Sequence, residues 1–155
     1  GLKNINSDVI ISYSDIYYDR IILDQIIKFK SKEIMIPINT DWQKVWKTRK
    51  KKIKLDAENL EFNKKNYLLF IGGKILKKYP KGQYMGLIFI PKNMIKKIIE
   101  IYKKNRIKKM QISNFLNFLI KKEFKIKVVK SKKNWYEFDD IQDYNNFKLN
   151  EKISY

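Results

Sequence analysis

The stretch DVIISY (8–13) decides the fold class. It is apolar, too short for a helix and rich in β-branched residues, so it predicts a buried strand in the centre of a sheet, ending just before Asp15. The next segment, 17–29, has apolar residues at helical spacing, and EIMIPI (33–38) returns to a strand that should stop near Pro37. Strand, helix and strand in succession predict an α/β fold.

The remaining sequence continues this pattern within one domain. A chain of 155 residues fits a single domain, which we place at 1–155. Residues 39–54 predict a polar helix or loop. Three strand-like segments in the middle of the chain, 53–62, 67–71 and 84–90, predict antiparallel additions to the sheet. In the last third of the chain, helices and strands follow one another again. The predicted elements there are helices at 94–105 and 115–120, strands at 124–129 and 135–138, and a helix at 140–147.

Cysteine and histidine are absent from the sequence. Their absence excludes thiolate catalysis, disulfides, zinc fingers, zinc hydrolases and a Ser-His-Asp triad. Any metal must be a hard cation held by oxygen ligands.

The chain is strongly basic, with 35 Lys+Arg against 16 Asp+Glu and a formal net charge of +19. Only three of the basic residues are Arg, so few bidentate forks are available to recognise guanine edges. Two interpretations stay open. In the first, the coding bias of an AT-rich genome places Lys at solvent-exposed positions without a specific function. In the second, the lysines form an electrostatic binding surface.

Nothing in the sequence predicts insertion into a membrane. No apolar run reaches the roughly 18 residues of a spanning helix, and residues 1–8 lack the pattern of a signal peptide. We therefore expect a soluble, cytoplasmic protein without a membrane partner.

Two aspartates follow predicted strands at the position where α/β sheets bind ligands. Asp15 follows the strand at 8–13, and Asp139 follows the short strand Trp-Tyr-Glu-Phe. Ligand crevices lie beyond the carboxyl ends of the strands, and two carboxylates can hold Mg²⁺, which completes its coordination with water and phosphate. The alternative for each aspartate is a helix N-cap.

Five ordered segments resemble the nucleotidyltransferases of the phosphocholine cytidylyltransferase type. The resemblance extends from about residue 5 to residue 148, and its most distinctive motifs are WYEFD and GQYMGL. It implies a three-layer, GT-A-like fold with a mixed sheet. The segments are DVIISYSDIYYD (8–19), DWQKVWKTRKKKIKLDAENL (41–60), FIGGK (70–74), KGQYMGLIFIPKNM (81–94) and NWYEFDDIQDY (134–144).

This resemblance implies roles for individual residues. Asp15 and Asp139 match the two family aspartates that bind the catalytic Mg²⁺. Aromatic rings and a carboxylate enclose the quaternary ammonium of choline in this family, because such a group donates no hydrogen bonds and is held by π faces and negative charge. The alternative for the tryptophans is packing in the core. The residues matched to substrate binding are Trp42 (with Asp41 beside it), Arg49, Glu58, Trp135, Tyr136 and Glu137.

The implied reaction is Mg²⁺-dependent transfer of a cytidylyl group from CTP to phosphocholine, with release of pyrophosphate. Such a transfer needs positioning and charge neutralisation rather than a covalent nucleophile. Close alternatives change the acceptor to aminoethylphosphonate or a sugar 1-phosphate. More distant ones are a non-catalytic partner that keeps the fold, and a nucleic-acid-binding module, which we do not expect because no RNP, KH or helix-turn-helix pattern is present.

One family element is absent from these 155 residues. The Gly-rich nucleotide loop, of the form L-A-A-G-x-G-x-R, does not occur, and Gly72-Gly73 is followed by no helical pattern. The resemblance thus implies a fold that is incomplete at the N-terminus, with the strand at 8–13 at an unpaired sheet edge. We expect that strand to pair with a missing segment or a second copy, and the chain alone to turn over little or no substrate.

Overall fold

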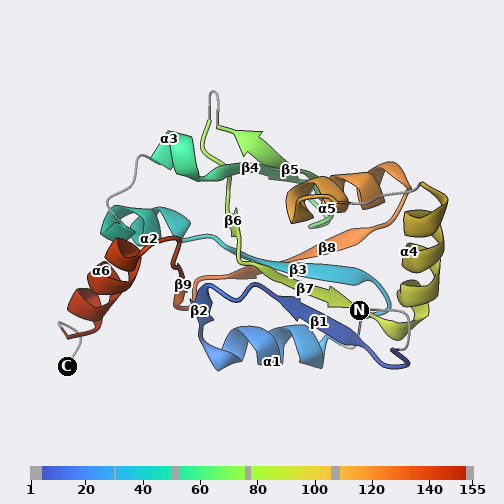
Figure 1. The fold of residues 1–155 in the computed structure, drawn as a ribbon, viewed down its shortest axis with the longest axis horizontal. Coiled ribbons are helices and arrows are strands. Elements are labelled where there is room, and N and C mark those ends of the chain that lie inside the picture. Colours follow the sequence, from blue (N-terminus) through green and yellow to red (C-terminus); the bar gives the residue numbers. More distant parts are fainter. Residues whose placement is uncertain (1–4, 30, 50–52, 76–77, 106–108, 153–155) are drawn as a thin grey trace.

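A computed structural model describes residues 5–29, 31–49, 53–75, 78–105 and 109–152 (Figure 1). The run Lys50 to Lys52 lies outside the described residues. The elements, in chain order, are β1 (Val9–Ser12), β2 (Ile16–Tyr18), α1 (Arg20–Lys28), β3 (Ile34–Asn39), α2 (Trp42–Arg49), α3 (Ile53–Asp56), β4 (Glu58–Phe62), β5 (Leu68–Lys74), β6 (Gln83–Tyr84), β7 (Leu87–Ile90), α4 (Lys92–Lys104), α5 (Ile112–Lys121), β8 (Ile126–Ser131), β9 (Trp135–Glu137) and α6 (Ile141–Lys152).

The main sheet is built around β3, and its strand directions are mixed. β3 pairs with β8 in parallel and with β6 and β7 antiparallel, and β1 pairs antiparallel with the other side of β7. All six residues of β3 are buried, as expected for a strand with neighbours on both edges and layers on both faces.

Side chains that alternate along β3 face two separate hydrophobic layers. Ile34, Ile36 and Ile38 pack with residues of α4, α5 and the β4–β5 pair, whereas Met35 packs on the other side with α1 and α2. The sheet therefore lies between two layers, as Figure 1 shows. The α/β, three-layer prediction is confirmed, and it follows from the period of two in β3.

Pro37 does not end its strand, contrary to the sequence prediction. β3 runs through it to Asn39, and the Pro37 carbonyl accepts a hydrogen bond of 3.2 Å from Met85 N–H. The N and C=O of a strand residue point toward the same neighbour, so the missing N–H of Pro37 faces the interruption between β6 and β7. No ladder hydrogen bond is lost there, which is why a proline is tolerated inside the sheet.

The strands β4 and β5 form a separate two-stranded sheet rather than an addition to the main one. Asn117 of α5 explains the difference. Its side chain accepts a hydrogen bond from Ile71 N–H at 3.1 Å and donates one to the Ile71 carbonyl at 2.5 Å. A helix thus satisfies the backbone groups of β5 that would otherwise bind another strand.

Two other boundaries differ from the sequence prediction. Residues 16–18, expected to lie outside any strand or at the start of a helix, form β2, which pairs antiparallel with β9. The predicted strand at 53–62 begins instead with a helical turn, α3, because Ala57 N–H bonds back to the Ile53 carbonyl at 2.9 Å. This turn brings Asp56 to within 3.3 Å of Arg49.

β1 lies at the edge of the main sheet in the described part of the chain, paired only with β7. The prediction of a central strand is therefore wrong for this structure, and the prediction of an unpaired edge is confirmed.

Among the described helices, none has both the length and the apolar composition that a bilayer span requires.

Gly86, between β6 and β7, provides a test of this packing. Its φ is +77°, and a Cβ there would lie 3.1 Å from Ile16 Cδ1 and from ring carbons of Tyr13. We expect Gly86→Ala to lower the free energy of unfolding by about 1–3 kcal/mol, through strain in the left-handed region and through displacement of Tyr13. Denaturant unfolding followed by fluorescence measures the loss.

Gly73→Ala is the matched control. Gly73 has a φ of +73°, and a Cβ added there would meet nothing within 4 Å, so this variant reports the backbone contribution alone, about 1 kcal/mol. Equal losses for the two variants would show that the contact with Tyr13 and Ile16 contributes nothing.

Candidate active site

The two predicted metal aspartates are brought together by the pairing of β2 with β9. Ile16 lies opposite Glu137 in that pair, and Phe138 N–H donates a hydrogen bond of 2.8 Å to the carbonyl of Asp15. Asp15 and Asp139 therefore occupy neighbouring strand ends, and both are exposed to solvent. The strand-end argument from the sequence placed these residues in one region.

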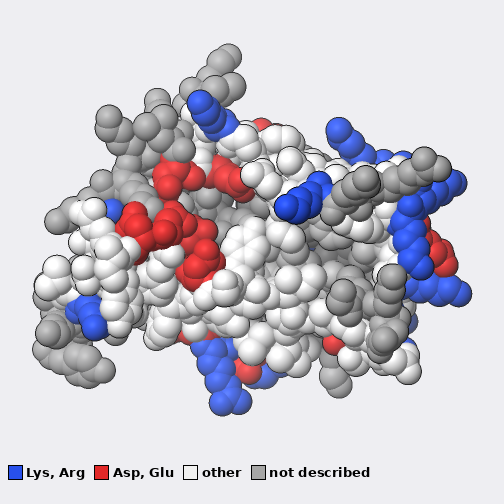
Figure 2. All heavy atoms as spheres, in the orientation of Figure 1, with Lys and Arg blue, Asp and Glu red and all other residues white. Residues whose placement is uncertain are grey.

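A pocket of about 200 Å³ lies next to this junction, and we call it the acidic pocket. Figure 2 shows acidic atoms gathered in one area of this face, while most of the visible Lys and Arg lie toward the margins. The pocket thus concentrates negative charge on a chain whose net charge is +19. Its lining residues are Tyr13, Trp46, Asp56, Glu58, Gln83, Tyr84, Gly86, Glu137 and Asp139.

Burial raises the pKa of two carboxylates of the acidic pocket, Glu137 and Glu58. Burial, followed by the charge of Asp139, raises the pKa of Glu137 to about 7, although the Arg49 charge opposes the shift. Burial also raises the pKa of Glu58, against a hydrogen bond of 3.3 Å from the Ser113 hydroxyl. Burial, with the charge of Glu58 second, raises the pKa of Tyr13 to about 12. A cationic group placed here would favour the ionised carboxylates.

The backbone of Glu58 is fixed by Gln83, which is 4% exposed. The Gln83 side chain accepts a hydrogen bond from Glu58 N–H at 3.2 Å and donates one to the Glu58 carbonyl at 2.5 Å. These hydrogen bonds join the β4–β5 sheet to β6 at the wall of the acidic pocket.

Arg49 lies behind the pocket, with its side chain 2% exposed. Its guanidinium bonds Glu137 at 3.3 Å and Asp139, and lies 3.3 Å from Asp56. The pKa of Arg49 is raised: burial acts against its charge, but the hydrogen bond of Asp143 and the surrounding carboxylate charges outweigh it. The sequence assigned Arg49 to substrate binding, and in the structure its described partners are carboxylates of the chain.

The aromatic residues predicted from the sequence are not in the acidic pocket. Trp42 is buried in the core and donates a hydrogen bond of 3.1 Å to the Pro80 carbonyl. Trp135, 1% exposed, and Tyr136 line a different hollow, of about 270 Å³. The aromatic residues of the acidic pocket are instead Tyr13, Trp46 and Tyr84.

Sequence reasoning missed several residues of this region. Tyr13 directly precedes Ser14-Asp15 after β1, and Asp143 lies in the first turn of the helix that follows Asp139, so each had a positional signal. Trp46, Gln83 and Tyr84 lay inside matched segments without an assigned role.

Three buried polar atoms of the pocket lining have no hydrogen-bond partner among the described residues. They are the indole nitrogen of Trp46, the hydroxyl of Tyr84 and one carboxylate oxygen of Asp56, which nevertheless lies near Arg49. Buried polar groups are normally satisfied, so their clustering on one pocket suggests a polar ligand.

A curated relative is similar to most of this chain. It is the CTP:phosphoglutamine cytidylyltransferase of Campylobacter jejuni subsp. jejuni serotype O:2, which is 29% identical over 147 residues, covering 88% of this chain and 57% of the relative. At 29% identity, most of this chain is thus similar in sequence to a cytidylyltransferase. No model of a known protein family matches it.

Solved nucleotidyltransferase structures share the fold of this chain. The inositol-1-phosphate CTP transferase from T. maritima superposes with a TM-score of 0.70 at 15% identity, covering 98% of this chain and 58% of that one. HddC from Yersinia pseudotuberculosis gives a TM-score of 0.62 at 20% identity, with the same coverages. The chain thus spans under two thirds of the length of the proteins it matches.

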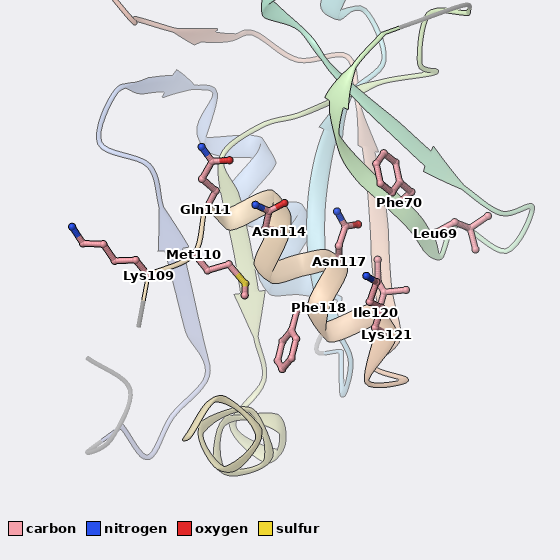
Figure 3. Close-up of a pocket in the computed structure, with 10 residues that line it drawn as sticks. All are labelled: Leu69, Phe70, Lys109, Met110, Gln111, Asn114, Asn117, Phe118, Ile120 and Lys121. Atoms are coloured by element: carbon pink, nitrogen blue, oxygen red, sulfur yellow. The ribbon is translucent and has the colours of Figure 1, made fainter. Parts of the chain in front are cut away.

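A wider groove of about 1050 Å³ lies elsewhere, between β5 and α5 (Figure 3). It is open, and its lining combines apolar side chains, amides and two lysines. None of the site residues assigned from the sequence lines it, so it is separate from the acidic pocket. The lining residues are Leu69, Phe70, Lys109, Met110, Gln111, Asn114, Asn117, Phe118, Ile120 and Lys121.

The donor chemistry of Asp15 and Asp139 fits a hard cation. Within the described ranges no group of three or more Asp, Glu, His or Cys has the arrangement of a metal cage. Mg²⁺ commonly takes only one or two protein carboxylates and keeps water and phosphate as its other ligands. Two exposed carboxylates at adjoining strand ends are compatible with that mode of binding.

The raised pKa of Glu137 predicts a pH-dependent effect of Glu137→Gln. The folded chain binds this proton more tightly than the unfolded chain, so Glu137 costs stability as pH rises through about 7. We expect the variant to be more stable than wild type by about 1–3 kcal/mol at pH 8.5, with the gain absent near pH 4.5. Thermal unfolding in EDTA across this range tests it.

Glu61→Gln is the control, since Glu61 is an exposed carboxylate on β4. A gain of the same size in both variants, or one independent of pH, would contradict the assignment to Glu137.

Proposed function

We propose that this chain is the acceptor- and metal-binding part of a cytidylyltransferase. An oxygen of a phosphate or phosphonate on the acceptor attacks the α-phosphorus of CTP. A new oxygen–phosphorus bond forms, the bond to the β-phosphate oxygen breaks, and pyrophosphate leaves. The observation that supports this function most directly is the acidic pocket, which Asp139 lines and which lies next to the junction of Asp139 with Asp15.

In this proposal Asp15 and Asp139 hold Mg²⁺. The ion, when bound, neutralises charge on the reacting phosphates. The contribution of the chain is to hold these two carboxylates at adjoining strand ends, through the β2–β9 pairing and the hydrogen bond between Phe138 and Asp15. Positioning of this kind accounts for much of the catalysis in phosphoryl transfer.

The acceptor carries a cationic amine as well as its phosphate. Glu58 and Glu137 supply negative charge, and Tyr13 and Tyr84, whose rings meet edge to face at 5.8 Å, supply aromatic surface. The face of Trp46 is already occupied by Arg49, 4.9 Å from the ring centroid. Phosphocholine, the acceptor implied by the sequence, and phosphoglutamine, named in the curated relative, are both candidates.

The unpartnered donors favour an acceptor with an additional anionic or carbonyl oxygen. The Trp46 indole N–H and the Tyr84 hydroxyl can each donate to such an oxygen, whereas a trimethylammonium head offers none. This distinction favours an amino-acid-like acceptor over phosphocholine.

The nucleotide-binding loop is supplied, in this proposal, by polypeptide other than these 155 residues, since no Gly-rich loop of the family type occurs in them. The edge of β1 offers a place for such a segment or a second copy to pair.

Acceptor binding to the chain tests this function without requiring turnover. Calorimetric titration at pH 8 with Mg²⁺ should give tighter binding of phosphoglutamine, phosphocholine and 2-aminoethylphosphonate than of glucose 1-phosphate. Glu58→Gln and Glu137→Gln should each weaken the amine-bearing ligands about 10- to 100-fold, because each removes a charged partner. Glu61→Gln, outside the pocket, should have no effect.

Other outcomes identify other functions. Tighter binding of glucose 1-phosphate would indicate a sugar-phosphate acceptor. Failure of all four ligands, together with salt-dependent binding of an oligonucleotide, would replace the proposal with a basic nucleic-acid-binding module.

A further inference from the structure

The first turn of α6 contains a buried carboxylate to which the sequence analysis gave no role. Asp143 is 2% exposed and receives two hydrogen bonds from Arg49, from Nε to Oδ1 and from Nη2 to Oδ2, each at 3.2 Å. Two parallel bonds of this kind fix both orientation and distance, which a single charge contact does not.

The same carboxylate also holds the backbone of the proposed metal ligand. Asp139 N–H donates a hydrogen bond of 3.0 Å to Asp143 Oδ2, and Asp143 N–H donates one of 2.9 Å to Asp140 Oδ1. The short segment between β9 and α6 is therefore tied to Asp143 through the main-chain N–H of Asp139 and the side chain of Asp140.

Arg49 links Asp143 of α6 to the side chains of Glu137 and Asp139. Beyond Asp143, its guanidinium bonds Glu137 and Asp139 on the β9 side, and it is stacked 4.9 Å from the centroid of Trp46. A guanidinium is suited to this task because its planar fork reaches several carboxylates in fixed directions, whereas an ammonium acts as a point charge.

We infer that Asp143 and Arg49 are positioning residues, which hold Asp139 and Glu137 in the geometry that binds the metal and the acceptor. The role rests on the proposed function, because it concerns the use of Asp139 as a ligand. Burying an ion pair costs desolvation that apolar packing avoids, so stability alone does not explain the pair. Its direct bonds to Asp139 give it a positional role.

Four variants and two measurements test this inference on the 155-residue chain. Asp143→Ala removes both contacts, Asp143→Asn keeps an acceptor but not the charge, and Arg49→Lys keeps the charge but not the fork. Asp24→Asn is the matched control, because Asp24 pairs with Arg20 on the surface, at 4.0 Å and with both side chains exposed. Amide hydrogen exchange at Asp139 is measured by NMR, and Mn²⁺ binding by electron paramagnetic resonance.

Asp143→Ala should accelerate exchange of the Asp139 amide, and Asp143→Ala and Arg49→Lys should weaken Mn²⁺ binding about 10- to 100-fold. Asp143→Asn should keep part of the amide protection and still weaken Mn²⁺. Wild-type Mn²⁺ affinity in the folded Asp143→Asn and Arg49→Lys variants, or unchanged amide exchange in a folded Asp143 variant, would overturn the inference. If Asp143→Ala does not fold, the other two variants decide.

The proposed function fails in a different way. If wild-type chain binds no Mn²⁺, or if Asp15→Asn leaves binding unchanged, the metal assignment is wrong. Amide exchange at Asp139 then still decides whether Asp143 fixes that segment.

Discussion

The complete burial of β3 is the constraint on which the rest of the molecule depends. A strand that is apolar on both faces requires a layer on each side, and these are provided by α4, α5 and the β4–β5 pair on one face and by α1 and α2 on the other. With both faces covered, polar side chains can gather only around the ends of the strands. The acidic pocket lies in that region, so its location follows from the burial of the sheet.

Charge imposes a second constraint, because several carboxylates around one pocket need a counterion that can itself be buried. The chain has 32 lysines, but a lysine ammonium is strongly hydrated and is held at the surface. One of only three arginines occupies the buried position instead. The excess of lysine and the acidic pocket are compatible because they occupy different parts of the molecule, as Figure 2 shows for one face.

Local patterns predicted part of the fold and part of the candidate site. Apolar spacing identified the strands around 8–13 and 33–38, and the strand-end rule selected Asp15 and Asp139, because both signals are local to one strand. The separate β4–β5 sheet and the contacts of Arg49 were not predictable, since each depends on how distant elements pack together. The WYEFD motif identified Trp135 and Tyr136, which line the other hollow, but not the aromatic residues of the acidic pocket, because those come from other segments of the chain that packing brings to the pocket.

Gly86 also affects how this molecule can diversify. Because the residue at the bend between β6 and β7 has no side chain, part of the pocket wall is backbone, and the Gly86 carbonyl accepts a main-chain hydrogen bond of 2.9 Å from Tyr13 N–H. The main chain therefore forms the bend, while side chains supply the chemistry of the pocket walls. Substitutions at Tyr13, Glu58 or Tyr84 can alter the preferred ligand while the scaffold remains the same, which gives an evolving lineage or a protein engineer a route to new acceptors without rebuilding the fold.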